Sequence, residues 1–225
     1  MTASFDNALV ADTIAKLKAM PQRGEYRCGM IDFPWWWSGG KKGRPQHYKR
    51  MRDREIMALG RAIADLGHPE GCWWGMWCTG AKAPSAFAVA KALRLRFSGR
   101  GWIWIKLKRS FDPRQLRVVR DVGADLATGM GFTTRKNAED LWLFKTGKPK
   151  RISKSVHEVI LAPVLEHSRK PDEAYARMER YCDGPRADIF SRQVRPGWDG
   201  FGDELGKFRP TPRAIDELGE AHAAG

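Results

Sequence analysis

Cysteine is scarce in this chain and follows no metal-binding pattern. The 225 residues include four cysteines, which form neither a CxxC pair nor a His/Cys cluster with zinc spacing: Cys28, Cys72, Cys78 and Cys182. We expect all four to be small buried hydrophobic residues rather than ligands.

Long apolar runs are also missing, as is any cationic amphipathic helix, so no membrane partner is expected. The first six residues have neither the basic nor the apolar region of a secretion signal, and we therefore expect a cytoplasmic protein. No GxGxxG sequence is present, which argues against a dinucleotide-binding loop.

Positive charge, by contrast, is abundant. Lys plus Arg number 40 and Asp plus Glu number 26, which gives a formal charge of +14. An excess of this size favours a polyanionic partner, and nucleic acid is the leading candidate; an inert basic surface is the alternative. Three basic clusters are candidates for phosphate contact, and because each follows a predicted strand we expect them to ring one face: Lys41, Lys42 and Arg44; residues 106–120; and residues 145–154.

Hydrophobic patterns predict an alternation of strands and helices. Strands are expected over residues 26–31, 71–78, 102–107, 138–145, 156–161 and 187–190, and helices over residues 5–18, 52–66, 84–95 and 171–182. Asp53 is expected to cap the second helix, and Pro171 to lie in the first turn of the last. The alternation predicts an α/β fold with a mostly parallel sheet and helices on both faces. We expect one domain over residues 1–208, followed by a Pro- and Ala-rich tail over residues 209–225.

The segment Asp32-Phe33-Pro34-Trp35 directly follows the first predicted strand. A carboxylate and a neighbouring backbone carbonyl can each accept one hydrogen of an NH2 group, and an indole ring offers a stacking face for a flat base. Pro34 favours an extended conformation at Phe33. The segment therefore suits a base with an exocyclic amine, although an Asp followed by Pro is also a common end to a strand.

Two later segments carry charges of the kind that hold a small ligand. Asp203 and Glu204 follow a glycine, and carboxylates are natural acceptors for a ribose diol. Lys170 precedes a predicted helix, where a cation can pair with a ligand carboxylate near the helix N-terminus. The alternatives are a solvated turn and a surface charge.

Read in order, these segments resemble the MT-A family of adenine N6-methyltransferases over about residues 26–205. The most specific part is His167-Ser168-Arg169-Lys170-Pro171-Asp172-Glu173, followed by Phe190 and by Gly197-Trp198-Asp199. The resemblance implies a Rossmann-like class I methyltransferase fold in permuted order. In that order the catalytic motif precedes the strand that binds the cofactor, S-adenosylmethionine.

The resemblance also implies roles for individual residues. Asp32 and the Phe33 carbonyl would grip the target amine, with Pro34 and Trp35 completing the motif and Trp35 forming a wall against the base. The substrate pocket would include Tyr48, Arg135, Asn137 and Glu139, and the cofactor would be held by Lys170, Arg192, Asp203 and Glu204. Two positions depart from the family pattern: Phe33 replaces a proline, and acids stand at 203 and 204 where many relatives have amides.

The function expected from this resemblance is methyl transfer to the N6 amine of adenine in DNA, with the base turned out of a duplex. No Pro-Cys dipeptide of the kind used by cytosine-C5 enzymes is present, so no covalent enzyme intermediate is expected. Three alternatives remain: RNA as the substrate, cytosine-N4 transfer, and a catalytically inactive nucleic-acid-binding partner subunit. The chain leaves little room for a separate target-recognition domain, and we expect a short or relaxed recognition sequence.

Overall fold

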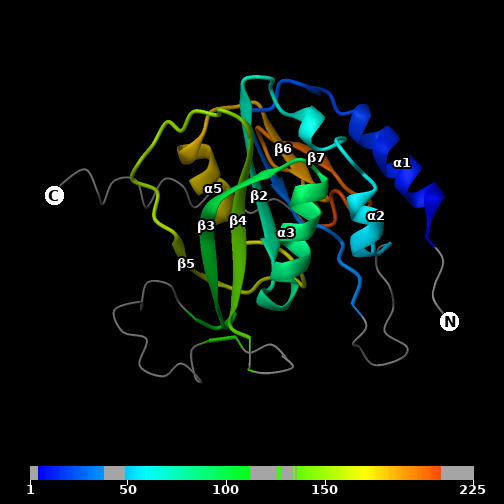
Figure 1. The fold of residues 1–225 in the computed structure, drawn as a ribbon. Coiled ribbons are helices and arrows are strands. Elements are labelled where there is room, and N and C mark those ends of the chain that lie inside the picture. The colour runs from blue at the N-terminus through cyan, green and yellow to red at the C-terminus, as the bar shows by residue number, and fades with distance from the viewer. Residues whose placement is uncertain (1–4, 38–48, 112–125, 128–133, 135, 209–225) are drawn as a thin grey trace.

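The computed structural model describes residues 5–37, 49–111, 126–127, 134 and 136–208 (Figure 1). The helices are α1 (Asn7–Lys18), α2 (Asp53–Met57), α3 (Ala83–Ala92) and α5 (Asp172–Tyr181), with short 3-10 helices η1 (Ala64–Leu66) and η2 (Gly80–Lys82). The strands are β1 (Cys28–Ile31), β2 (Gly71–Cys78), β3 (Arg96–Leu107), β4 (Ala138–Gly147), β5 (Val159–Pro163), β6 (Arg186–Ile189) and β7 (Asp199–Phe201).

These strands form one seven-stranded sheet in the order β5-β3-β4-β2-β1-β6-β7. β4 runs antiparallel to both of its neighbours, and every other pairing is parallel. The expected mostly parallel sheet is therefore confirmed. The carboxyl ends of six strands lie at one edge, which is where ligands bind in sheets of this kind.

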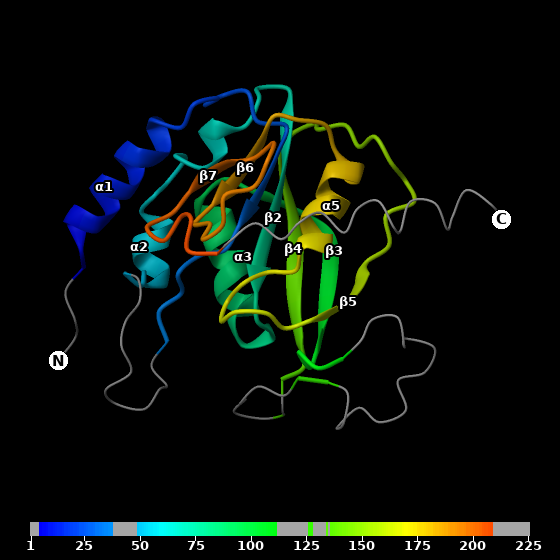
Figure 2. The same cartoon turned by 180° about the vertical axis from the view of Figure 1, so that it is seen from behind.

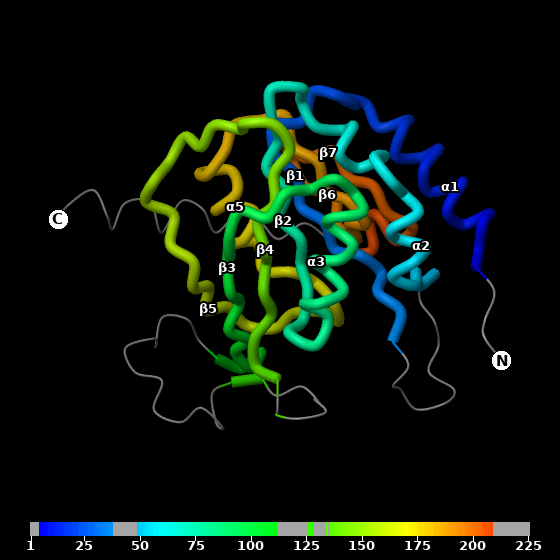
Figure 3. The backbone as a smooth tube through the Cα atoms, viewed as in Figure 1, coloured from blue at the N-terminus to red at the C-terminus, as the bar shows by residue number. Residues whose placement is uncertain are grey.

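Helices cover both faces of the sheet, as expected. α1, α2 and α3 lie on one face and α5 on the other, as the two opposite views show (Figures 1 and 2). Figure 3 follows the chain through the centre of the sheet, where β1 lies between β2 and the late strand β6. Strands far apart in the sequence thus meet beside the segment that follows β1.

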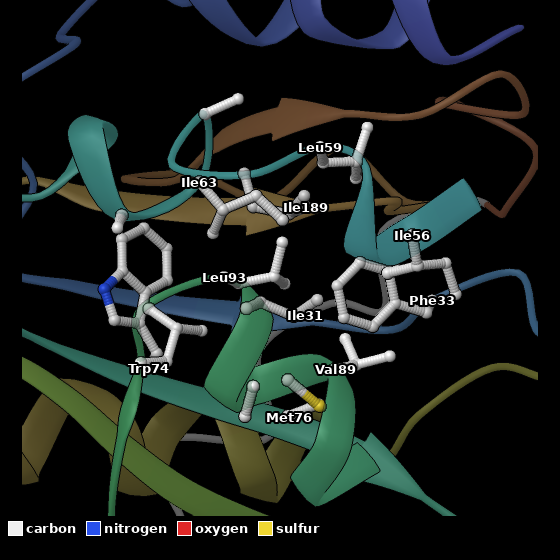
Figure 4. Close-up of a cluster of buried hydrophobic side chains, with 14 of the residues drawn as sticks. Ile31, Phe33, Ile56, Leu59, Ile63, Trp74, Met76, Val89, Leu93 and Ile189 are labelled. Atoms are coloured by element: carbon white, nitrogen blue, oxygen red, sulfur yellow. The ribbon is translucent and has the colours of Figure 1, made fainter. Parts of the chain in front are cut away.

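Each face has its own hydrophobic core. Figure 4 shows the core on the α2 and α3 side, where Ile31 and Ile189 of the sheet lie near Val89 and Leu93 of α3. The core under α5 includes Met178 of that helix and buried side chains of β1 to β5. β1 and β2 are buried along their whole length, because both faces of the central sheet are covered.

The single helix predicted over residues 52–66 is wrong. α2 ends at Met57, Gly60 has a φ of +57°, and only a turn of 3-10 helix follows at Ala64–Leu66. The left-handed backbone at Gly60 cannot continue a helix. The apolar spacing still identified core residues, since Ile56, Leu59 and Ile63 are all buried.

Helix ends and two strands also differ from expectation. The N-cap of α2 is Arg52 rather than Asp53, whose carboxylate instead accepts a hydrogen bond from Lys82 at 3.0 Å. Pro171 is the N-cap residue of α5 and does not lie in its first turn. β3 begins at Arg96, six residues before the predicted start, and the short strand β7 was not predicted.

The expectation that all three basic clusters ring one face is wrong for residues 145–154. β4 is antiparallel, and its end at Gly147 lies opposite Gly71, the first residue of β2. Lys148 and Lys150 therefore follow β4 at the edge away from Asp32. No helix among the residues placed in the structure is long and apolar enough to cross a bilayer.

Candidate active site

Asp32 lies at the carboxyl edge of the sheet, one residue beyond β1. Its backbone N–H donates to the Ile189 carbonyl at 3.1 Å, which fixes the chain as it leaves β1 toward β6. Its carboxylate is 21% exposed. Asp32 and Arg192 both line three adjoining cavities, so these two side chains stand at the junction of the site.

A chain of four alternating charges begins at Asp32. The Lys170 ammonium lies 3.2 Å from Asp32 Oδ2 and 2.8 Å from Glu139 Oε1. The second oxygen of Glu139 lies 2.7 Å from the Lys106 ammonium. The fold brings together side chains from distant parts of the sequence: Asp32 follows β1, Lys106 comes from β3, Glu139 from β4, and Lys170 from the turn before α5.

The chain of charges shifts the pKa values of its members. Burial raises the pKa of Asp32 above its ordinary value, and the Lys170 ammonium opposes that rise. Burial also acts to raise the pKa of Glu139, but Lys170 and Lys106 outweigh it and hold that pKa at about 2. The pKa of Lys170 is raised, because its two carboxylates outweigh the effect of burial. At neutral pH both carboxylates have a cation within hydrogen-bond distance.

The backbone of the Asp32–Trp35 motif is anchored on both sides. The Phe33 carbonyl accepts the Trp35 N–H at 2.8 Å, and the Pro34 carbonyl accepts the Met51 N–H at 2.8 Å. The Phe33 ring is buried, with its centroid 5.3 Å from those of both Trp35 and Phe190. A carbonyl oxygen has two lone pairs, so Phe33 retains one for a further donor. Packing and hydrogen bonds thus restrain the backbone at Phe33.

The largest cavity at this edge has a volume of about 560 Å3. Asp32, Glu139 and Lys170 line it, together with aromatic side chains that include Trp77 and Trp104. Lys106 lies 4.8 Å from the centroid of the Trp104 ring, and Lys170 lies 5.6 Å from that of Trp77. The cavity therefore combines flat apolar walls with a charged end.

Asn137, predicted to lie in the substrate pocket, is held by hydrogen bonds to two neighbouring segments. Its side-chain amide donates to the Ala127 backbone carbonyl at 3.0 Å. Its backbone carbonyl accepts a hydrogen bond from the Lys106 backbone N–H at 2.8 Å. It does not line the large cavity. Asn137 therefore ties the chain before β4 to the end of β3.

The second cavity is lined by the predicted acids. Glu204 lies 3.2 Å from the Arg192 guanidinium and also pairs with Lys207. Asp203 is half-exposed, with Lys16 of α1 at 4.0 Å. No sequence pattern indicated that α1 would contribute to this cavity, which Asp12, Thr13 and Lys16 also line.

Gly202 allows the two loops beside this cavity to pack closely. A Cβ atom at position 202 would lie 2.2 Å from the Ser191 carbonyl oxygen, well inside contact distance. The close approach of the loops brings Arg192 to Glu204.

Sequence reasoning missed a buried acid next to the site. Asp188 accepts hydrogen bonds from Ser191 at 2.7 Å and Tyr175 at 3.3 Å, and Arg195 lies 3.9 Å away. Burial raises the pKa of Asp188 to about 6, although Ser191 and Arg195 act in the opposite direction. An acid between the apolar residues of the strand Ala187–Ile189 was the available signal, since such residues need buried partners.

Five predicted residues lie outside the described part of the chain: Lys41, Lys42, Arg44, Tyr48 and Arg135. Among the residues that are described, no group of three or more His, Cys, Asp or Glu side chains is placed to hold a metal ion.

Comparison with known proteins gives one family match. The MT-A70 family model matches residues 26–204 of the chain. No curated protein matches it. The matched region runs from just before β1 to Glu204 and so includes Asp32, Glu139, Lys170 and Arg192, whereas α1 lies outside it.

Proposed function

The chain belongs to the MT-A70 family of S-adenosylmethionine-dependent adenine N6-methyltransferases, and from that premise we propose that it methylates adenine in DNA. The observation that carries the proposal is Asp32. Its carboxylate lies at the junction of a large aromatic cavity and a second cavity lined by Asp203 and Glu204. The aromatic walls of the first cavity suit a base, and the acids that line the second suit the ribose hydroxyls of the cofactor.

The residues of the second cavity fit S-adenosylmethionine. Asp203 is half-exposed and can accept hydrogen bonds from ribose hydroxyls, and Glu204 keeps lone pairs beyond those that face Arg192 and Lys207. Lys170 lines the large cavity and the third cavity rather than this one; it uses its ammonium for two carboxylates and so retains one N–H for the carboxylate of the cofactor. When bound, the cofactor supplies an electrophilic methyl group.

The protein contributes position and charge to the transfer. An exocyclic amine is a poor nucleophile because its lone pair is delocalised into the ring. Asp32 and the Phe33 carbonyl would accept one hydrogen each, which favours the pyramidal nitrogen that attacks the methyl group. The nitrogen loses a proton after it is methylated. Asp32 is suited to accept that proton, because burial raises its pKa.

DNA rather than RNA is proposed as the substrate. The +14 charge supports a polyanionic substrate of either kind. An inactive partner subunit is the other alternative, suggested by Phe33 in the place of a proline. The anchored backbone around Phe33 supports an active enzyme, because it supplies the restraint that the proline would give.

The test is methyl transfer to matched DNA and RNA. Purified protein is incubated with isotopically labelled S-adenosylmethionine and with single-stranded DNA, duplex DNA or RNA of the same sequences, and nucleosides are then analysed by mass spectrometry. We expect label in N6-methyladenine from DNA. Label in RNA alone would refute the choice of DNA, label in N4-methylcytosine would refute adenine, and no label in any nucleic acid would favour the inactive subunit.

A further inference from the structure

Three residues that line the large cavity each have a buried polar atom with no hydrogen-bond partner among the described residues. These atoms are the indole nitrogens of Trp35 and Trp77 and the hydroxyl oxygen of Thr79. Trp104 donates to the Ala162 carbonyl at 2.8 Å and Trp198 to Glu179 at 2.8 Å, whereas the indole nitrogens of Trp74 and Trp142, which do not line this cavity, are also unpaired. A buried donor without an acceptor costs free energy, so unpaired donors in a cavity favour a ligand that supplies acceptors.

The sheet places two of these groups beside the predicted catalytic acid. Ile31 of β1 pairs with Met76 of β2, so Asp32 follows β1 next to Trp77. Thr79 lies two residues beyond Trp77 in an extended backbone, which directs the two side chains to the same face. A base whose amine is held by Asp32 would therefore have its ring near both groups.

Thr79 stands where its hydroxyl would ordinarily be used by the backbone. It is the N-cap residue of η2, and threonine at such a position usually accepts a hydrogen bond from the first helical turn. Here the side chain makes no capping bond. The hydroxyl is therefore not used by the turn that follows it.

We propose that Trp77 and Thr79 read the ring of the target base by donating hydrogen bonds to its nitrogen acceptors. This inference rests on the proposed function and names the groups that select the base. Adenine presents unprotonated ring nitrogens beside its amine, at N1 on one side and at N7 on the other. Guanine has a protonated N1 and no amine at position 6, so it matches neither Asp32 nor a donor that faces N1.

The test combines variants of the protein with variants of the base. Thr79→Val removes one donor and keeps the shape of the side chain, whereas Trp77→Phe removes the other donor together with part of the buried ring. Two matched controls carry the same changes at buried, unpaired groups that do not line the cavity: Thr146→Val in β4 and Trp74→Phe in β2. The substrates are oligonucleotides whose target adenine is replaced in turn by 1-deazaadenine, 3-deazaadenine or 7-deazaadenine, each of which keeps the amine.

We expect each cavity variant to lower kcat/KM on ordinary adenine about tenfold, which is the effect of one lost hydrogen bond to a buried partner. For each variant, one of the deaza substrates should lower kcat/KM of the wild type by a similar factor. On that substrate the variant should have the same kcat/KM as the wild type. The controls should keep the wild-type rate. Thermal unfolding of Thr79→Val should occur at the wild-type temperature or above, because an unpaired buried hydroxyl has been removed.

Equal losses for a variant on adenine and on all three deaza substrates would overturn the inference, as would equal losses in the controls. Equilibrium binding of the same oligonucleotides, followed by fluorescence anisotropy, separates this inference from the proposed function. Suppose that the protein transfers no methyl group, but that one deaza substrate binds more weakly than adenine to the wild type and equally well to the variants. That result would support recognition of the base by Trp77 and Thr79 and would refute the proposed enzymatic function. Affinity that is indifferent to every ring nitrogen, in a protein without activity, would refute both.

Discussion

Lys170 is the residue on which the charge balance of the site depends. Its side chain is 8% exposed and contacts both Asp32 and Glu139, so removing its charge would leave Glu139 paired with Lys106 and Asp32 under the influence of Arg192. Losing one partner of a buried ion pair is more costly than losing the whole pair, because the remaining charge stays desolvated. The lysine is therefore expected to support the folded state as well as the ligand.

We predict that Lys170→Met lowers the free energy of unfolding by about 3–5 kcal/mol at neutral pH, as measured by urea denaturation. Because the pKa of Glu139 is low, its ionised carboxylate stabilises the folded state at pH values above the ordinary pKa of a glutamate. This stability is lost as the pH falls through about 2. The variant should therefore unfold at a higher pH on acidification. Lys91→Met, at an exposed lysine of α3, is the control and should change stability by less than about 0.5 kcal/mol. Equal stability of the two variants would contradict this role of Lys170.

Asp188 gives a pH dependence of the opposite sign. Its pKa is raised to about 6, so its contribution to stability is complete below the unfolded pKa of about 4 and is lost as the pH rises through about 6. The wild type should therefore lose up to about 3 kcal/mol relative to Asp188→Asn between these pH values. Chemical denaturation of both proteins from pH 4 to pH 7 measures the difference. A constant difference across this range would show that Asp188 is ionised throughout.

The helix α3 ends with an arginine where the backbone favours glycine. Arg94 has a φ of +62°, and the Leu95 N–H donates to the Ala90 carbonyl at 2.9 Å, the bond that closes a Schellman motif. Left-handed backbone is unfavourable for a residue with a Cβ atom.

We predict that Arg94→Gly raises the free energy of unfolding by about 1 kcal/mol, which corresponds to roughly 2–4 °C in thermal denaturation. Lys91→Gly, three residues earlier within the helix, should have the reverse effect of about 1 kcal/mol. A loss of stability at both positions would mean that the arginine side chain makes a contact worth more than the strain of its backbone.

Among helices and strands, local hydrophobic patterns predicted the positions of segments better than the directions in which strands run in the sheet. Residues 71–78 form the predicted strand without any difference in bounds, because a continuous apolar run fits a strand covered on both faces. The helix over residues 52–66 was wrong because Gly60 interrupts it, and three-residue β7 is too short to show a period. The direction of β4 depends on its pairing with β2 and β3, which no local pattern records.

The candidate site was predictable where a motif is contiguous and hidden where side chains meet across the sheet. Asp32 and Lys170 were selected from the sequence, but their mutual contact depends on the turn before α5 folding back over β1. Lys16 gave no signal, because its position depends on how α1 packs. The place of Asn137 in the substrate pocket was implied by resemblance alone and stays a prediction, and its amide donates to the Ala127 carbonyl.

The whole molecule carries a charge that should make nucleic-acid binding sensitive to salt. The logarithm of affinity for duplex DNA should fall linearly with the logarithm of salt concentration, by about 0.9 for each phosphate neutralised. Changing Lys41, Lys42 and Arg44 to Gln together should reduce the slope by up to about 3. The matched control changes Lys148, Lys150 and Arg151, which follow β4 at the opposite edge of the sheet, and should leave the slope unchanged. A larger change in the control would show that DNA binds the other edge.

The central claim is that Asp32 holds the amine that receives the methyl group. The most direct measurement is the amount of labelled N6-methyladenine formed by the wild type and by Asp32→Ala, with calorimetric titration of S-adenosylmethionine into each protein as the control for an intact cofactor cavity. We predict N6-methyladenine from the wild type, a loss of at least about 100-fold in the variant, and largely unchanged cofactor affinity. Near-normal turnover by Asp32→Ala with normal cofactor affinity would contradict the claim and place the chemistry elsewhere.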